Sequence, residues 1–162
     1  MTQGPTYPET AEDDATVARQ VLDAGRYLVL ATADADGRPW PTPVWFAREG
    51  REFCWLSRPQ ARHSANVAAR ADVGFVVFET PVPTDGRTRA VYAEAIAGEV
   101  PEADRERCIA VLDQRARAQG LGGFTAADVV APAGLRLYRA VVSQFFVLHP
   151  DRDIRRPVAA DV

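Results

Sequence analysis

The sequence contains no lysine, and all 19 of its basic residues are arginine. This absence excludes a Schiff-base lysine, a phosphate-loop lysine and a Ser–Lys dyad. Any phosphate must therefore be held by arginine, histidine, hydroxyl groups and backbone amides. The chain also lacks a basic stripe, because its net charge is -3 and its arginines are scattered. A nucleic-acid groove needs such a stripe, so no nucleic-acid partner is expected.

Long apolar runs are missing as well. None approaches the roughly 18 residues of a membrane span, so no membrane partner is expected. Residues 1–19 have neither the basic start nor the apolar centre of a secretory signal. The only cysteines, Cys54 and Cys108, lie in apolar segments without motif spacing, as expected of buried thiols in a reducing cytoplasm. We therefore expect one cytoplasmic domain with a sizeable core in these 162 residues.

Histidine is scarce, and no Asp or Glu stands at metal-ligand spacing from His63 or His149. We therefore expect no zinc or iron site. Spacing leaves a Ser–His–Asp triad open, but no nucleophile-elbow pattern is present. The sequence identifies no catalytic acid or base.

The sequence does contain short apolar segments separated by turn signals. Six are predicted to be strands: 26–33, 38–47, 52–57, 73–79, 90–100 and 134–148. Helices are predicted over about 11–24 (capped by Thr10), 60–71 and 102–119, with a small capped turn at TAAD. Residues 1–9 are expected to be a flexible lead-in, 10–149 the domain and 150–162 a tail.

Hairpin connections and short helices favour a mainly β (α+β) fold, an antiparallel six-stranded sheet closed into a barrel with helices at its rim. Strand 26–33 is expected to be buried on both faces. In the last strand, the odd-numbered residues are expected to form the apolar face; they include Leu137, Val141 and Phe145.

The stretch from 57 to 66 places cations at the start of a helix. That end of a helix favours acidic residues, by roughly 0.3–1 kcal/mol each, so cations there indicate a bound anion. Ser57 and Gln60 have capping-box spacing. The predicted phosphate-binding residues are Ser57, Arg58, Arg62, His63 and Asn66. The alternative is a solvated helix with a serine cap and surface arginines.

The segment PWPTPVWFA has prolines at 39, 41 and 43. Proline has no N–H group, so this cannot be a fully paired central strand. A flat heteroaromatic ring could lie against such a backbone. Alternatively, this is an edge strand whose tryptophans fill the core. Tyr138 and Gln144, in the last strand, are either satisfied core groups or neighbours of a bound ring.

The order of these segments resembles the FMN-binding split-barrel superfamily, the pyridoxamine 5'-phosphate oxidase-like proteins. The resemblance covers roughly residues 10–148, from LVLATADADGRPWPTPVWF through EFCWLS and ARHSANVAARADV to GFVVF and beyond. It implies a split β-barrel homodimer with a flavin at the interface. It also implies that Pro43, Val44, Trp45 and Phe46 run beside the flavin ring, and that Arg62 and His63 hold the FMN phosphate with Ser57. His63 stands where the family usually has lysine.

The resemblance implies an FMN-dependent oxidoreductase acting on a small molecule. The segment VSQFFVLHPDRDIRR lacks the Arg-x-His element of the true oxidase, so that activity is not expected. One sister branch uses the deazaflavin F-420 and another binds haem. The alternatives are therefore an F-420-dependent reductase on the same fold, or a non-enzymatic flavin- or haem-binding protein with His63 or His149 as the axial ligand.

Overall fold

The computed structural model describes residues 13–80, 88–149, 154–158 and 162. The helices are α1 (Asp14–Ala24), α2 (Arg62–Ala69) and α3 (Glu102–Ala118), with a 3-10 turn, η1, at Ala126–Asp128. The strands are β1 (Tyr27–Ala33), β2 (Pro39–Trp45), β3 (Ala47–Glu49), β4 (Glu52–Ser57), β5 (Asp72–Phe78), β6 (Ala90–Glu99), β7 (Arg136–Leu148) and β8 (Arg155–Val158). Each predicted helix and strand is found within a few residues of its expected position. The lead-in 1–9 and Thr10 lie outside the described residues.

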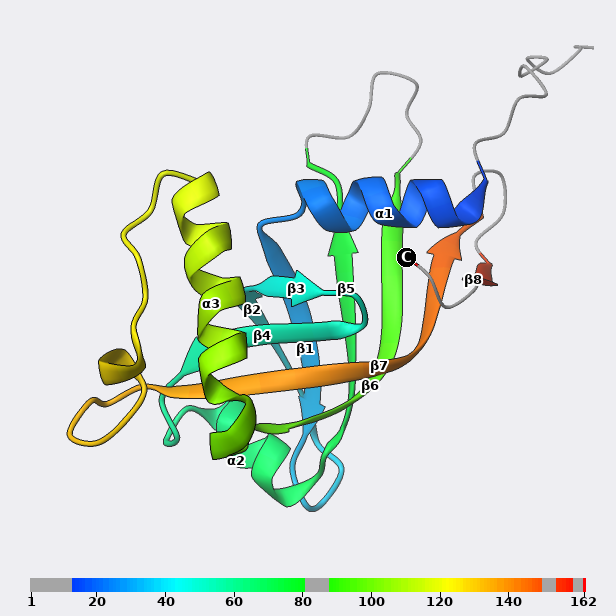
Figure 1. Ribbon diagram of the computed structural model, residues 1–162. Helices are drawn as coiled ribbons and strands as arrows, with labels where there is room; N and C mark the ends of the chain where they lie inside the picture. The colour runs from blue at the N-terminus through cyan, green and yellow to red at the C-terminus, as the bar shows by residue number, and fades with distance from the viewer. Residues whose placement is uncertain (1–12, 81–87, 150–153, 159–161) are drawn as a thin grey trace, which may run out of the picture.

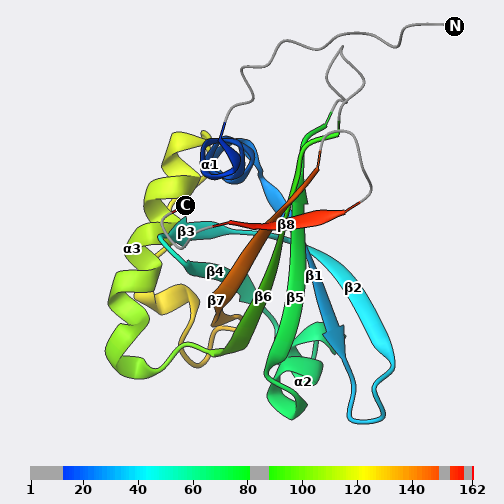
Figure 2. The same cartoon turned by 90° about the vertical axis from the view of Figure 1, so that its right-hand side faces the viewer.

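The eight strands form one antiparallel sheet in the order β2-β1-β5-β6-β7-β4-β3, with β8 added to β7. β2 and β3 are opposite edges of this sheet, yet Phe46 alone separates them in the chain. The sheet therefore curls round on itself into a split β-barrel (Figures 1 and 2). The predicted fold class is confirmed.

The predicted strand 38–47 is two strands, which corrects the expected count of six. Trp45 pairs with Tyr27 of β1, whereas Ala47 pairs with Cys54 of β4. Phe46 lies between the two pairings, and it is only 1% exposed. Burial of this ring fixes the point at which the chain changes partner. β2 is an edge strand of the described sheet, as its prolines predicted.

A second difference is β8, which lies in the segment expected to be a tail. Its residues pair with Phe145–Leu148 of β7. Val158 and Val162 join the main core cluster, and Arg48 Nη1 donates a hydrogen bond to the Val162 carbonyl at 2.9 Å. The sequence RRPV has no alternation of polar and apolar residues, so it gave no strand signal.

The predictions of which faces of β1 and β7 are buried also need correction. β1 is buried on one face only, since Tyr27 at its start is 59% exposed. In β7, Val141 is 45% exposed and Val142 is buried. The register between β6 and β7 shifts between Glu94 and Ala95, so the buried face of β7 changes from even to odd residues. A bulge of this kind cannot be read from alternation alone.

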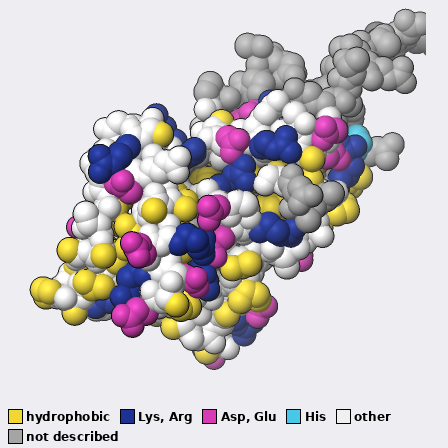
Figure 3. Space-filling view, in the orientation of Figure 1, with side chains coloured by type: hydrophobic (Ala, Val, Ile, Leu, Met, Phe, Trp, Pro, Cys, Tyr) yellow, Lys and Arg dark blue, Asp and Glu magenta, His cyan; other side chains and the backbone are white. Residues whose placement is uncertain are grey.

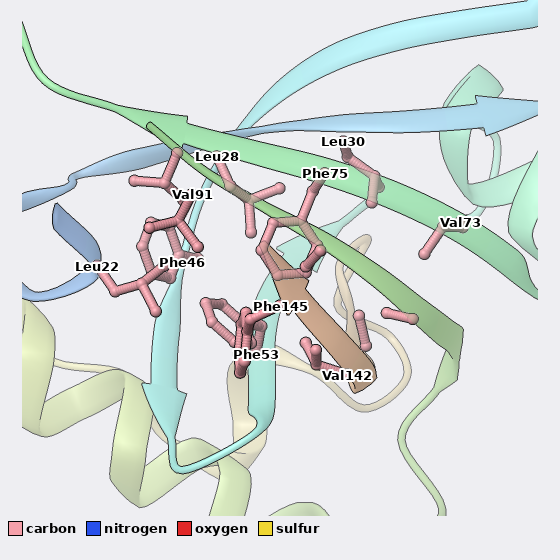
Figure 4. Packing of buried hydrophobic residues seen from close by; sticks show 14 of the residues in the cluster. Leu22, Leu28, Leu30, Phe46, Phe53, Val73, Phe75, Val91, Val142 and Phe145 are labelled. Carbon is pink, nitrogen blue, oxygen red and sulfur yellow. The ribbon is translucent and has the colours of Figure 1, made fainter. Parts of the chain in front are cut away.

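The core fills the barrel. Phe53 lies 4.7 Å from Phe75, 5.5 Å from Phe46 and 6.1 Å from Phe145 between ring centroids, at tilted angles that aromatic pairs favour. Figure 4 shows these rings with the aliphatic side chains around them. A smaller apolar cluster lies under α3: Ala47, Cys54, Val100, Cys108, Ile109, Leu112, Val129 and Leu137.

The helices cover the rim and one side of the barrel. α1 lies across one end, α2 lies at the other end, and α3 stands along the side (Figures 1 and 2). Asp13 caps α1 by accepting a hydrogen bond from the Thr16 N–H at 2.9 Å. No described helix is both long and apolar enough to cross a membrane. Acidic and basic side chains are interspersed on the face that carries α3 (Figure 3).

Candidate functional site: the start of α2 beside the β1–β2 hairpin

The start of α2 has no capping side chain. Ala61 is the N-cap residue, and the first turn contains no acidic residue. The predicted capping box of Ser57 and Gln60 is therefore wrong. The chain turns once more before the helix, because the Ala61 N–H bonds to the Arg58 carbonyl at 3.0 Å. The first amides of α2 consequently have no side-chain acceptor among the described residues, which suits an anion.

Ser57 and His63 lie together at this point. Ser57 Oγ is 2.8 Å from His63 Nε2, and Ser64 Oγ donates to Ser57 Oγ at 2.9 Å. Burial lowers the pKa of His63. A neutral His63 that carries its proton at Nδ1 can accept a hydrogen bond from the Ser57 hydroxyl at Nε2, which leaves Nδ1–H as a donor. Within the described chain, Nδ1 has no partner, so it is free for a ligand.

The two predicted arginines occupy different positions. Arg62 is the first residue of α2, and its guanidinium lies over the Trp40 ring at 4.2 Å from the centroid. Its exposed charge is therefore held above the end of β2. Arg58 precedes the helix, so the four-residue spacing does not place it on the face of Arg62. Arg58 is exposed, with its guanidinium beside Gly134.

Asn66 is not available to a phosphate. It is 5% exposed, and its Nδ2 donates to Thr32 Oγ1 at 3.0 Å. Thr32 Oγ1 in turn donates to the Trp40 carbonyl at 3.1 Å. This chain of hydrogen bonds fastens α2 to the β1–β2 hairpin. Asn66 therefore positions the site, a role that neither its spacing nor the resemblance indicated.

The segment Pro43–Phe46 offers little side-chain surface to a ligand. Val44 and Phe46 are buried in the barrel. Trp45 packs against Phe124 and donates from Nε1 to Gln119 at 2.9 Å. Pro43 alone is exposed. A ring beside this strand would contact Pro43 and the free backbone edge.

Gln144 lies far from these residues within one chain. In the strand register, Gln144 pairs with Glu94, Glu94 with Gly74, Gly74 with Ala31, and Ala31 with Pro41 of β2. Four strand spacings make about 19 Å. The Gln144 amide donates to the Phe145 and Val158 carbonyls, at 2.7 and 3.0 Å, and so holds β8. Tyr138 is buried and stacks on Trp55.

Two hollows flank the outward face of β1. One, of about 460 Å³, has a floor of small residues, Ala31 and Gly74, and is bounded by Arg70 at the end of α2. The other, of about 680 Å³, lies between the end of α1, Tyr27, Pro43 and Phe78. The small residues Ala31 and Gly74 inside strands are the sequence signal for the floor of the first hollow, which was not among the predicted features.

A split barrel with an uncapped, cationic helix start at its rim is a fold and a site suited to a phosphate-bearing ligand. A family model described as pyridoxamine 5'-phosphate oxidase matches residues 16–131. The chain belongs to that family. No curated protein matches the sequence.

Solved structures with different ligands share the fold. HutZ, the haem storage protein of Vibrio cholerae, has a TM-score of 0.61 and 24% identity, over 80% of this chain and 90% of its own. An FAD-binding protein of Mesorhizobium loti has a TM-score of 0.59 and 21% identity, over 82% and 90%. An F420 reductase has a TM-score of 0.57 and 19% identity, over 86% and 98%. At these identities the likeness shows the fold alone.

Proposed function

We propose that this protein is an FMN-dependent oxidoreductase acting on a small organic molecule, with the cofactor phosphate at the start of α2. The observation that carries the proposal is the helix start, which has no side-chain cap and no acid but carries Arg62 and His63. A helix start of this kind stabilises an anion through its amides and its dipole.

The residues present fit a phosphate. The α2 amides, His63 Nδ1 and the exposed Arg62 guanidinium are donors, and Arg62 supplies the planar fork that phosphate oxygens accept. Ser57 holds the His63 ring in place, and Ser64 in turn donates a hydrogen bond to Ser57. The exposed Pro43 lies three residue steps along β2 from Trp40, the residue under Arg62, which is about 10 Å along the strand. The ring of FMN would lie toward Pro43.

When bound, FMN supplies the redox chemistry of its ring. The chain's own part is to bind the phosphate, orient the ring against β2 and keep water from it. Glu79 and Tyr27 line the same hollow as Pro43, and proton transfer is assigned to no side chain.

We further propose that two copies pair through the outward face of the sheet. Ile96 and Val141 are cross-strand neighbours there, 53% and 45% exposed. Their apolar surface adjoins the shallow floor of Ala31 and Gly74. A second copy laid on this face would bury that surface and cover the cofactor ring.

Titration of the apoprotein with FMN tests the phosphate position. We expect Arg62→Ala to weaken FMN binding at least tenfold, equivalent to about 1.4 kcal/mol. Arg62→Lys keeps the charge without the planar fork, so its FMN affinity should lie between those of the parent and Arg62→Ala. Arg105→Ala, on α3, is the matched control and should bind as the parent does. Equal affinity of the parent and Arg62→Ala would refute this position for the phosphate.

The same titration separates the alternatives. Tight binding of F-420 with no FMN binding would favour the deazaflavin reductase. A Soret band on adding haem, abolished by His63→Ala or His149→Ala, would favour a haem-binding protein. Flavin absorbance in the purified protein would support the proposal directly.

A further inference from the structure

Glu52, Cys54 and Cys108 form a cluster between β4 and α3, apart from the proposed cofactor site. Glu52 and Cys54 are two residues apart on β4, so they point to the same side of the strand. Cys108 Sγ lies 3.1 Å from Glu52 Oε1, and Cys54 Sγ lies 3.7 Å from the same oxygen. The three ligand atoms lie within 4.8 Å of one another. Both cysteines are free, 2% and 0% exposed.

Two arginines flank the carboxylate of this cluster. Arg107 Nη2 lies 2.7 Å from Glu52 Oε1, and Arg139 Nη1 lies 3.0 Å from Oε2. Each arginine has a further partner: Glu49 at 2.9 Å for Arg107, and Asp104 at 2.9 Å for Arg139. The cluster can therefore carry extra negative charge beside guanidinium groups that already lie there.

The donor spacing matches a small tetrahedral ion. Thiolates at about 2.3 Å and a carboxylate oxygen at about 2.1 Å from one ion lie about 3.6–3.8 Å from each other. The Cys54–Glu52 distance of 3.7 Å already has this value. The Cys108–Glu52 distance of 3.1 Å needs an opening of about half an ångström.

We propose that Glu52, Cys54 and Cys108 bind a thiophilic divalent d10 cation, Zn²⁺ or Cd²⁺. Two metal–sulfur bonds and one metal–oxygen bond form, both S–H bonds break, and two protons pass to the solvent. Nothing is oxidised or reduced. The complex carries one net negative charge, which faces Arg107 and Arg139. Three protein ligands leave a fourth position for water.

Arg107 is the group that must move to admit the ion. Its side chain is 44% exposed and covers Glu52 Oε1, whereas Glu52 is 16% exposed. Because Arg107 also binds the exposed Glu49, it can leave Glu52 and keep one ion pair. The cysteines were not predicted as ligands because 53 residues of chain separate them, and only the packing of α3 on β4 joins them.

Cadmium titration of untagged, reduced, metal-free full-length protein tests the site. We expect the ultraviolet thiolate-to-cadmium charge-transfer band to saturate at one ion per chain. Two protons should be released per ion in weakly buffered solution. Zn²⁺ should abolish the band by competition, and either ion should raise the unfolding temperature through mass action.

Variants separate this site from adventitious binding. Cys54→Ala, Cys108→Ala and Glu52→Gln should each weaken Cd²⁺ binding at least tenfold. Glu106→Gln, at an exposed position of α3, is the matched acidic control and should bind as the parent does. Glu52→Gln keeps both thiols and the side-chain shape, so it remains informative if a cysteine variant fails to fold. Absence of the band at micromolar Cd²⁺, or equal affinity of Glu106→Gln and Glu52→Gln, overturns the proposal. So does a Cys54–Cys108 disulfide that forms in place of the metal complex.

Discussion

At the scale of single residues, His63 connects the fold to the proposed phosphate. Burial lowers its pKa, so the folded chain disfavours the charged ring. The unfolded chain binds more protons as the pH falls through the ordinary histidine range, near 6.5. The stability contributed by neutral His63 is therefore present above that range and is lost below it.

We expect the free energy of unfolding of the apoprotein to fall more steeply between pH 7.5 and 5.5 than that of His63→Gln. Glutamine keeps a polar partner for Ser57 but does not titrate. Urea unfolding at several pH values measures both slopes. Identical slopes would show that His63 does not contribute to the pH dependence.

FMN binding should have the opposite pH dependence. A phosphate beside His63 favours the charged ring and raises its pKa, so binding takes up a proton. We therefore expect FMN affinity to rise as the pH falls from 8 to 6.5, and this rise should vanish in His63→Gln. Calorimetry in two buffers of different ionisation enthalpy measures the proton uptake. This dependence belongs to the proposed FMN site, whereas the stability slope does not require it.

At the scale of elements, Gly25 sets the join between α1 and β1. A Cβ built there would lie 2.4 Å from Val77 Cγ1 and 3.1 Å from the Val21 carbonyl oxygen. Val77 is fully buried in β5 and has little rotamer freedom. The glycine lets the end of α1 lie against the sheet, which a side chain would prevent.

Gly25→Ala should destabilise the fold by about 1–3 kcal/mol through overpacking. The matched control is Gly122→Ala, because a Cβ at Gly122 meets nothing within 4 Å. That variant should be neutral, or more stable by up to about 1 kcal/mol through the unfolded state. Urea denaturation curves give both differences, and equal midpoints would contradict the close contact at Gly25.

The helices and strands show which parts of the fold can be predicted from the sequence. Alternation and turn residues predicted the existence of six strands and three helices, since those signals are local, whereas the caps predicted for α1 and α2 are not the ones found. Phe46 could not be recognised as the change of partner, because continuous apolarity from Val44 to Ala47 looks like one strand. Likewise, the four-residue spacing places Asn66 and Arg62 on one helix face, but it cannot show that Asn66 donates its hydrogen bond to Thr32 of β1.

At the scale of the whole molecule, the proposed pairing covers the outward face of the sheet with a second copy. We expect light scattering to give twice the chain mass of 17.7 kDa. Ile96→Glu should yield monomers, because it places a charge beside Val141 at the centre of the proposed contact. It should also weaken FMN binding if the cofactor is covered by the second copy.

Leu121→Glu is the matched control for this prediction. Leu121 is 50% exposed, but it follows α3 and lies outside the proposed contact. It should leave the mass unchanged. A parent protein that scatters as a monomer would reject the pairing and leave the fold and the phosphate position to be judged separately.

The docking of Val162 against the core has a practical consequence for protein engineering. The side chain of this residue is 8% exposed, and its carbonyl is held by Arg48 from β3. A reporter or affinity tag fused directly after Val162 would begin at a buried residue. Such a fusion is expected to destabilise the fold, so its unfolding temperature should be measured before any loss of cofactor binding is assigned to the proposed site.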